Sequence, residues 1–171
     1  MNRWDKFFMD IAIRTAKESK CKKKKVGAVI VKDKRILSNG YNGTPSGWKN
    51  QEEFECEETL YLCPFCKGKL NRLDNIFYSC KNCNKITKKP ITQLITKHEI
   101  VIHAEMNAIA FAAKYGISIE GCSLYVTMAP CPDCAKLIVQ SGIKEVIYLE
   151  EYKKRDGIIF LKNNNIIVRK I

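Results

Sequence analysis

The sequence predicts an α/β fold, in which helices cover both faces of a mixed five-stranded sheet to give a three-layer sandwich. Two observations lead to this prediction. Segments in which apolar residues recur at helical spacing alternate with short apolar runs that are typical of strands. Residues 51–97 interrupt this alternation with paired cysteines and many lysines, which indicates an inserted module. A chain of 171 residues is large enough to bury one core without disulfides.

The first part of the chain predicts one helix followed by a hairpin. Apolar residues recur at helical spacing over residues 4–16, and residues 26–31 form an apolar run typical of a strand. Asp33 and Lys34 make a short turn before residues 35–38, which we expect to form an antiparallel edge strand. We expect residues 39–47 to form a loop, because they contain three glycines and one proline.

The part of the chain after the insertion predicts three helices that alternate with three strands. Gly116 and Gly142 follow the first two helical segments and mark their ends. Pro132 suits the first position of the second helix, because its missing N–H is not needed there. The predicted helices are 103–115, 132–140 and 155–162, and the predicted strands are 123–127, 145–149 and 166–169.

Two short segments indicate a catalytic zinc site. Residues 103–105 read His-Ala-Glu and residues 130–134 read Pro-Cys-Pro-Asp-Cys, which together match the H-x-E and P-C-x-x-C signature of zinc deaminases. Cys131 and Cys134 lie at a helix start, where the positive end of the helix dipole favours thiolates. One histidine and two cysteines leave the fourth position of a tetrahedral zinc open to water. The predicted ligands are His103, Cys131 and Cys134, and the predicted general acid/base, which is not a ligand, is Glu105.

The inserted module predicts a second zinc site. Two C-x2-C pairs are separated by 13 residues, which is the spacing of a zinc ribbon. Four thiolates complete the zinc tetrahedron, so we expect a structural site that replaces the small core of the module. A ribbon of this kind either packs subunits together or attaches nucleic acid, and both roles stay open. The predicted ligands are Cys63, Cys66, Cys80 and Cys83.

Several segments resemble the dCMP deaminase family. They are residues 41–47 (Tyr-Asn-Gly-Thr-Pro-Ser-Gly), 103–109, 127–136 and 141–148, and the resemblance covers residues 1 to about 50 and about 98 to 171. It implies a catalytic domain of the cytidine deaminase type over residues 1–171, interrupted by the zinc-ribbon module at 51–97, a region that is shorter in the family. It also implies zinc-dependent hydrolysis of dCMP to dUMP and ammonia, which supplies dUMP for thymidylate synthesis.

The resemblance implies ligand contacts, regulation and assembly as well. The side chain of Asn42 would bind the sugar hydroxyl, and loop amides would receive the 5′-phosphate. The effectors dCTP and dTTP would regulate a homohexamer, with Mg²⁺ accompanying the nucleotides. One catalytic and at least one structural Zn²⁺ are expected, and some similar enzymes carry a further structural zinc. The implied substrate-binding residues are Asn42, Gly43, Thr44 and Ala104, and the implied further zinc ligands are Cys21, Cys56 and His98.

Charge and hydropathy bear on location and partners. No run approaches the ~20 apolar residues of a membrane span, so we expect no membrane partner and a cytoplasmic enzyme, or one in the host cytoplasm if a virus encodes it. The net charge of +12 favours a polyanion only weakly, because a lysine-rich composition can also reflect an AT-rich genome, and nucleic acid is not excluded. Two alternatives stay open: a deaminase of tRNA adenosine or single-stranded DNA cytosine, and a non-catalytic nucleotide-binding protein, against which Glu105 argues.

Overall fold

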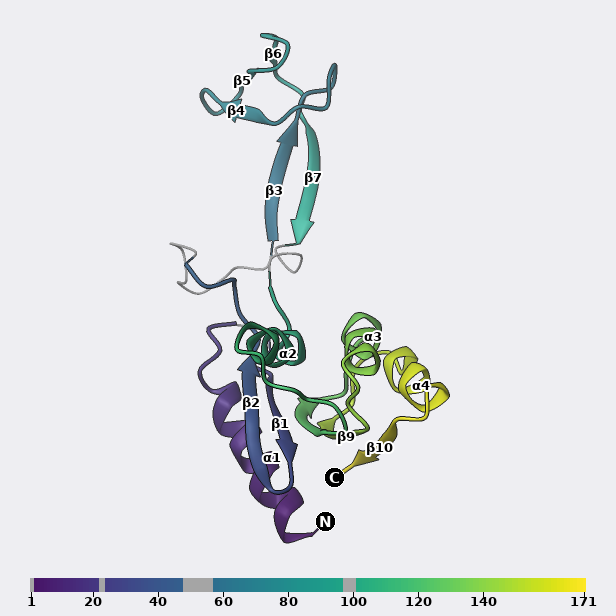
Figure 1. Ribbon diagram of the computed structural model, residues 1–171. Coiled ribbons are helices and arrows are strands. Elements are labelled where there is room, and N and C mark those ends of the chain that lie inside the picture. Colours follow the sequence, from purple (N-terminus) through teal and green to yellow (C-terminus); the bar gives the residue numbers. More distant parts are fainter. Residues whose placement is uncertain (1, 22–23, 48–56, 97–100) are drawn as a thin grey trace. The chain divides into compact units, whose positions relative to one another are not determined.

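The computed structural model describes residues 2–21, 24–47, 57–96 and 101–171 (Figure 1). The chain divides into two compact units. Residues 1–54 and 100–171 form one, which we call the α/β unit, and residues 55–99 form the other, which we call the cysteine-rich unit. Among the described residues, no helix combines the length and the apolar character that crossing a bilayer requires.

The α/β unit is built on a five-stranded mixed sheet with the strand order β10-β9-β8-β1-β2. Strand β1 pairs antiparallel with β2 and β8, whereas β8, β9 and β10 run parallel to one another. The mixed sheet and the edge position of the second strand confirm the prediction. The strands are β1 Gly27–Lys32, β2 Arg35–Tyr41, β8 Ser123–Met128, β9 Glu145–Glu150 and β10 Ile167–Lys170.

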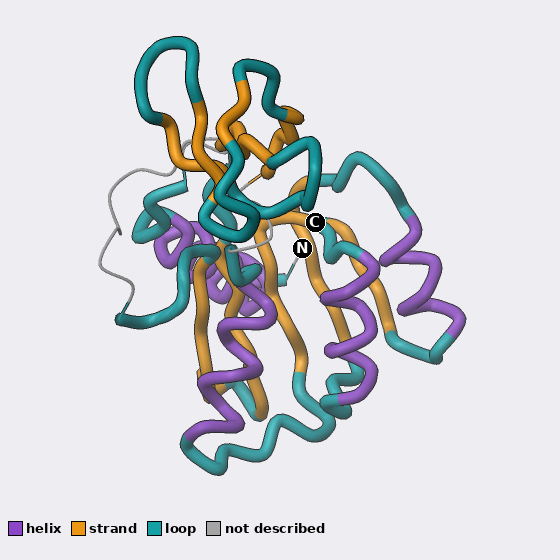
Figure 2. Tube along the Cα trace, turned by 90° about the horizontal axis from the view of Figure 1, so that it is seen from above, coloured by secondary structure: helices purple, strands orange, loops and turns teal. Residues whose placement is uncertain are grey.

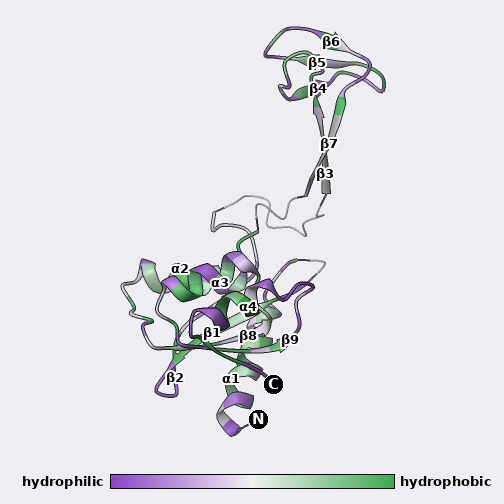
Figure 3. Cartoon of the chain, turned by 90° about the vertical axis from the view of Figure 1, so that its right-hand side faces the viewer, coloured by the Kyte–Doolittle hydropathy of each residue, from purple (hydrophilic) through white to green (hydrophobic). Residues whose placement is uncertain are grey.

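Helices cover both faces of this sheet, as Figure 2 shows in purple. The buried side chains of α1 pack with Val29, Val31 and Ile147 on one face, while α2, α3 and α4 pack with Ile30 and Val146 on the other. Successive side chains of a strand point to opposite faces, so the central strands are apolar on both and appear hydrophobic in Figure 3. The helices are α1 Arg3–Ala16, α2 Ala104–Lys114, α3 Pro132–Gln140 and α4 Asp156–Asn163.

The prediction of a loop over residues 39–47 is wrong at its start, because β2 continues to Tyr41. Gly40 explains the error. A Cβ atom at this position would lie 2.5 Å from the amide N of Ala108 and 2.6 Å from the carbonyl O of Ala104. The glycine therefore allows the backbone of α2 to approach the strand, and it does not mark a turn.

The cysteine-rich unit contains two small sheets. Strands β3 and β7 form an antiparallel pair, and β4, β5 and β6 form a three-stranded sheet. The buried cluster consists of Cys63, Leu70, Tyr78 and Cys80, with the ring of Tyr61 4.8 Å from that of Tyr78. Two cysteines thus make up half of this small core. The strands are β3 Glu57–Leu62, β4 Leu70–Arg72, β5 Tyr78–Cys80, β6 Ile86–Thr87 and β7 Ile91–Thr96.

Candidate active site and metal centres

Three side chains with zinc-binding atoms converge at the N-termini of α2 and α3. Nδ1 of His103 lies 3.4 Å from Sγ of Cys131 and 3.3 Å from Sγ of Cys134. Ligand atoms around one tetrahedral zinc lie roughly 3.5 to 3.8 Å apart, given the usual Zn–N and Zn–S bond lengths. The separations and the donor set therefore fit zinc, and the structure brings together the three ligands predicted from the sequence.

Both helices begin at a residue of this cluster. His103 is the N-cap of α2 and Cys131 is the N-cap of α3, and each has extended backbone. Pro132 occupies the first position of α3, as expected. A helix N-terminus presents unpaired amides and the positive end of the dipole, which stabilise thiolates. Local helix geometry thus favours anionic sulfur ligands at this place.

Gly157 supports the backbone that carries Cys131. A Cβ atom at Gly157 would lie 2.1 Å from the carbonyl O of Pro130 and 2.9 Å from the carbonyl C of Cys131. The first turn of α4 can therefore lie against this segment only with glycine at that position. Gly157 was not predicted from the sequence, because the contact joins segments that are distant in the chain.

The two thiols of the cluster have opposite pKa shifts. The pKa of Cys131 falls to about 4, first because of its hydrogen bond with Cys134 and also because of the His103 imidazole. The same thiol–thiol contact and burial raise the pKa of Cys134, and the hydrogen bond to Cys131 raises the pKa of His103. The contact between the two sulfur atoms thus favours a thiolate at Cys131 and disfavours a second one at Cys134. A cation bound between them stabilises both thiolates.

Glu105 lies in the first turn of α2, two residues after His103, and its side chain is buried. Desolvation raises the pKa of its carboxyl group above the ordinary range, although the neighbouring positive charge of His103 opposes this shift. A carboxyl group whose pKa is moved toward neutrality can both accept and donate a proton. Glu105 is therefore suited to proton transfer beside the cluster.

The four predicted ribbon ligands also converge. Their sulfur atoms all lie within 4.8 Å of one another, with Cys63 and Cys83 3.6 Å apart and Cys66 and Cys80 3.5 Å apart. Roughly 3.8 Å is expected between two thiolates on one tetrahedral zinc, so these residues fit a closed zinc site. Although burial opposes it, backbone amides of the loop lower the pKa of Cys63 to about 7. These amides stabilise a thiolate at that position.

Each cysteine pair is followed by a residue in the left-handed region. Lys67 has φ +60° and Asn84 has φ +55°, directly after Cys66 and Cys83. This conformation turns the chain back, so the amide of Cys63 donates to the carbonyl O of Gly68, and the amide of Cys80 donates to the carbonyl O of Lys85, both at 2.9 Å. The two loops therefore have the same construction. Neither Lys67 nor Asn84 was singled out from the sequence.

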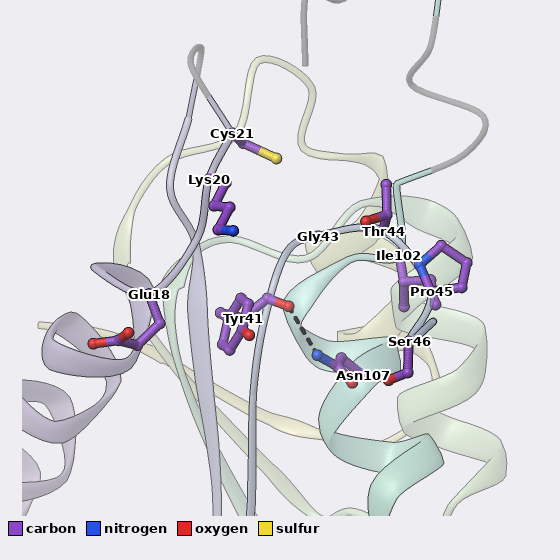
Figure 4. Close-up of a pocket in the computed structure, with 10 residues that line it drawn as sticks. All are labelled: Glu18, Lys20, Cys21, Tyr41, Gly43, Thr44, Pro45, Ser46, Ile102 and Asn107. Carbon is purple, nitrogen blue, oxygen red and sulfur yellow. Dashed lines mark hydrogen bonds between the residues drawn. The ribbon is translucent and has the colours of Figure 1, made fainter. Parts of the chain in front are cut away.

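A pocket of about 150 Å³ lies in the α/β unit beside the loop that follows β2 (Figure 4). Thr44 and Ser46 from this loop, Lys20 from the segment after α1, and Asn107 from α2 line it. Nδ2 of Asn107 donates to the carbonyl O of Tyr41 at 3.0 Å, which ties α2 to the strand end. Neither Lys20 nor Asn107 was predicted from the sequence. For Asn107, the available signal was its position one helical turn after His103.

Of the predicted substrate-binding residues, two line the pocket and two are buried. Asn42 is buried; its Oδ1 accepts from the amide of Val26 at 2.8 Å and its Nδ2 donates to the carbonyl O of Lys24 at 2.9 Å. The backbone N–H and C=O of Gly43 both pair with Ile102, which adjoins the zinc cluster. Gly43 and Thr44 line the pocket. Ala104 is fully buried in the core.

Of the implied further zinc ligands, Cys56 and His98 lie outside the described residues. Cys21 is buried beside the pocket, and its Sγ lies 3.9 Å from the carbonyl O of Asn42. Within the described ranges, groups of three or more metal-ligating side chains occur only at the two clusters above.

Comparison with known proteins gives the family. Residues 2–150 match the cytidine and deoxycytidylate deaminase zinc-binding region. The deoxycytidylate deaminase of Enterobacteria phage T2 is 43% identical over 154 residues, which cover 85% of this chain and 79% of that protein. The enzyme of Mus musculus is 36% identical, over 86% of this chain and 65% of that protein.

A solved structure agrees over the full length. The crystal structure of the dCMP deaminase from cyanophage S-TIM5, in complex with dCMP and dUMP, is 33% identical to this chain. Its TM-score is 0.70, and the match covers 100% of this chain and 99% of that one. The chain therefore belongs to the cytidine and deoxycytidylate deaminase family, whose members bind zinc.

Proposed function

We propose that this chain catalyses the hydrolytic deamination of dCMP to dUMP and ammonia, which supplies dUMP for thymidylate synthesis. The observation that carries the proposal is the buried carboxyl group of Glu105 beside the cluster of His103, Cys131 and Cys134. The names of the relatives and the nucleotides in the cyanophage structure support the choice of substrate.

Metal binding and proton transfer are assigned to different residues in this reaction. His103, Cys131 and Cys134 hold the catalytic zinc, which when bound supplies a Lewis acid that lowers the pKa of water to about 7. Glu105 takes the proton of the attacking water and delivers it to ring N3 of cytosine. Glu105 then takes the proton of the hydroxyl group now attached to C4 and transfers it to the exocyclic amino group, so the C4–N bond breaks, ammonia leaves and C4 becomes a carbonyl. The site excludes bulk water around Glu105, because this side chain is only 4% exposed.

The loop after β2 provides the nucleotide contacts in this proposal. Gly43 pairs with Ile102, next to the zinc ligand His103, so the loop and the cluster are connected through backbone hydrogen bonds. Lys20, Thr44 and Ser46 offer a cation and two hydroxyl groups to a phosphate. Asn42 holds the backbone at residues 24–26 and retains one N–H and one lone pair for a sugar hydroxyl.

The same proposal includes the metal content and the organisation of the chain. Residues 1–171 form a catalytic domain interrupted by a zinc ribbon at 51–97, with one catalytic zinc and a structural zinc at Cys63, Cys66, Cys80 and Cys83. The enzyme works in the cytoplasm, or in the host cytoplasm if a virus encodes it. It assembles as a homohexamer regulated by dCTP and dTTP with Mg²⁺.

A direct substrate comparison tests the proposed reaction. Zinc-loaded protein is incubated separately with dCMP, deoxycytidine, dCTP, a cytosine-containing oligonucleotide and tRNA, and loss of the exocyclic amine is followed by absorbance. We expect selective conversion of dCMP and stimulation by dCTP. Turnover of the polynucleotides alone would replace this proposal by a polynucleotide deaminase, and no turnover of any substrate by zinc-loaded protein would favour a non-catalytic nucleotide-binding protein.

A further inference from the structure

The cysteine-rich unit leaves large apolar side chains outside its core. Its buried cluster uses two cysteines, Leu70 and Tyr78. Phe65, between the first two cysteines, is 60% exposed, and Ile86 is 61% exposed. Two more apolar side chains, Leu73 and Ile76, are also more than half exposed. These side chains contribute little to the folding of the unit, so their surface is available to a partner.

The segment that carries these side chains is strongly positive. Residues 61–91 contain six lysines and one arginine against a single acidic residue, Asp74. The carboxylate of Asp74 accepts hydrogen bonds from the amides of Ile76 and Phe77, both at 2.7 Å. These local hydrogen bonds hold the carboxylate against the backbone of its own turn. Four zinc-bound thiolates and one Zn²⁺ together contribute about −2, which leaves the segment cationic.

The aromatic and cationic side chains occur in pairs. Nζ of Lys85 lies 4.2 Å from the centre of the Phe65 ring, and Nζ of Lys88 lies 4.8 Å from that of Phe77. Lys85 follows the second cysteine pair, so its contact joins the two cysteine loops. Each ammonium group therefore lies over one face of its ring. A base that stacks on the opposite face places its phosphate within reach of the cation, and such pairing of rings with cations is typical of proteins that bind single strands.

Two acidic positions lie in β3 of the cysteine-rich unit. Glu57 and Glu58 begin this strand, and Cys63 directly follows its end. At about 3.3 Å per residue, five residues of strand separate the backbone of Glu58 from Cys63 by about 16 Å. This backbone separation exceeds the Debye length of about 8 Å at physiological salt.

We propose that the cysteine-rich unit binds single-stranded DNA, with Phe65 stacking on a base and Lys85 contacting the adjacent phosphate. The choice of DNA over RNA rests on the proposed function, because deamination of a deoxynucleotide feeds DNA synthesis, where single strands are exposed. A second copy of this chain is the competing occupant. Charge disfavours it, since two copies would bring two cationic surfaces together.

Fluorescence anisotropy with labelled oligothymidylate tests the proposal on the full zinc-loaded chain. This probe contains no cytosine, so it cannot be a substrate for the proposed deamination. Phe65→Ala removes the stacking ring, and Phe7→Ala, which truncates a 50% exposed aromatic of the α/β unit, is the matched control. Lys85→Gln removes one phosphate contact, with Lys153→Gln as its control. Zinc content and dCMP turnover are measured for every variant, which separates failure of this proposal from failure of the proposed reaction.

We expect Phe65→Ala to weaken binding about tenfold, the loss of one base–aromatic stack, with the salt dependence unchanged. Lys85→Gln should reduce the slope of log K against log salt by about 0.7, as one lost phosphate contact does on a single strand. Both controls should bind like the wild type. Equal weakening by Lys153→Gln, unchanged binding by Phe65→Ala with its zinc retained, or tighter binding of oligouridylate would overturn the proposal. So would a change of oligomeric mass in Phe65→Ala without a loss of DNA binding, which would identify an interface between copies.

Discussion

Arg169 in the last strand holds Asp5 in the first helix through two hydrogen bonds of 2.9 Å. Tyr125 donates a third hydrogen bond to the same carboxylate at 3.0 Å, and Asp5 is only 2% exposed. The Nε of Arg169 also donates to Glu145 at 2.8 Å. One buried carboxylate therefore joins α1 to β8 and β10, which fixes the helix on its face of the sheet.

This network predicts a loss of stability in acid. The hydrogen bond with Arg169 is the main reason that the pKa of Asp5 falls from 3.8 to about 2. The folded state stabilises the ionised form of Asp5 more than the unfolded state does. The contribution of Asp5 to the free energy of unfolding is therefore complete above the unfolded pKa and is lost as the pH falls from about 4 to 2. Arg169 is partly exposed, so we expect about 1 to 2 kcal/mol from this group. Asp5→Asn should lack this part of the pH dependence in urea unfolding.

A control on the same helix makes that measurement specific. Asp10→Asn changes an exposed aspartate of α1, and its free energy of unfolding should change as that of the wild type does when the pH falls from about 4 to 2. Protonation of the zinc ligands affects all three proteins equally, so the difference between variants isolates Asp5. An equal acid-induced loss in Asp5→Asn and the wild type would show that the pairing with Arg169 does not contribute.

Glu105→Gln tests the proton transfer. The amide has nearly the same volume and cannot accept the proton of water, so turnover of dCMP should fall by about 10²- to 10⁴-fold or more. Zinc content should stay unchanged, because Glu105 is not one of the converging ligands. Glu120→Gln, at an exposed position, is the control and should keep the wild-type rate. Undiminished turnover in Glu105→Gln would overthrow the proposed mechanism.

Gly40→Ala tests the close approach of α2 to β2. The added methyl group would meet backbone atoms of Ala108 and Ala104 at 2.5 and 2.6 Å, and neither can move as a side chain does. We expect a loss of about 1 to 3 kcal/mol in the free energy of unfolding, measured with urea on the zinc-loaded protein. Gly43→Ala is the matched control, because its nearest atom outside its own neighbours is 3.6 Å away. Equal stability of the two variants would contradict this reading of Gly40.

The sequence predicted those features that depend on local spacing. The helical positions of α1 follow from apolar periodicity, and Asp33 and Lys34 form the expected turn with φ of 49° and 61°. Cysteine spacing likewise indicated the four converging sulfur atoms of the cysteine-rich unit. In each case, neighbours within a few residues determine the geometry.

Features that depend on packing between distant segments were not predicted. Gly40 looked like a turn residue because nothing in its neighbours indicates that Ala108 packs against it. The pairing of Asp5 with Arg169 joins residues 164 positions apart, and no spacing in the sequence links the two. The pocket also draws on distant segments, which only the folded sheet brings together.

Metal content provides the last test, because each cluster draws its ligands from one unit of the chain. We expect two zinc ions per chain by elemental analysis. Replacing Cys63 and Cys80 together by Ser should reduce this number to one and preserve dCMP turnover, since the remaining ligands lie in the α/β unit. Cys131→Ser should also lose one zinc ion, and this variant should lose dCMP turnover as well. Cys122→Ala, at a buried cysteine outside both clusters, should keep both ions.

Three ions in the wild type would instead support a further site at Cys21, Cys56 and His98. Loss of turnover in the variant that lacks Cys63 and Cys80 would show that catalysis depends on the second zinc site.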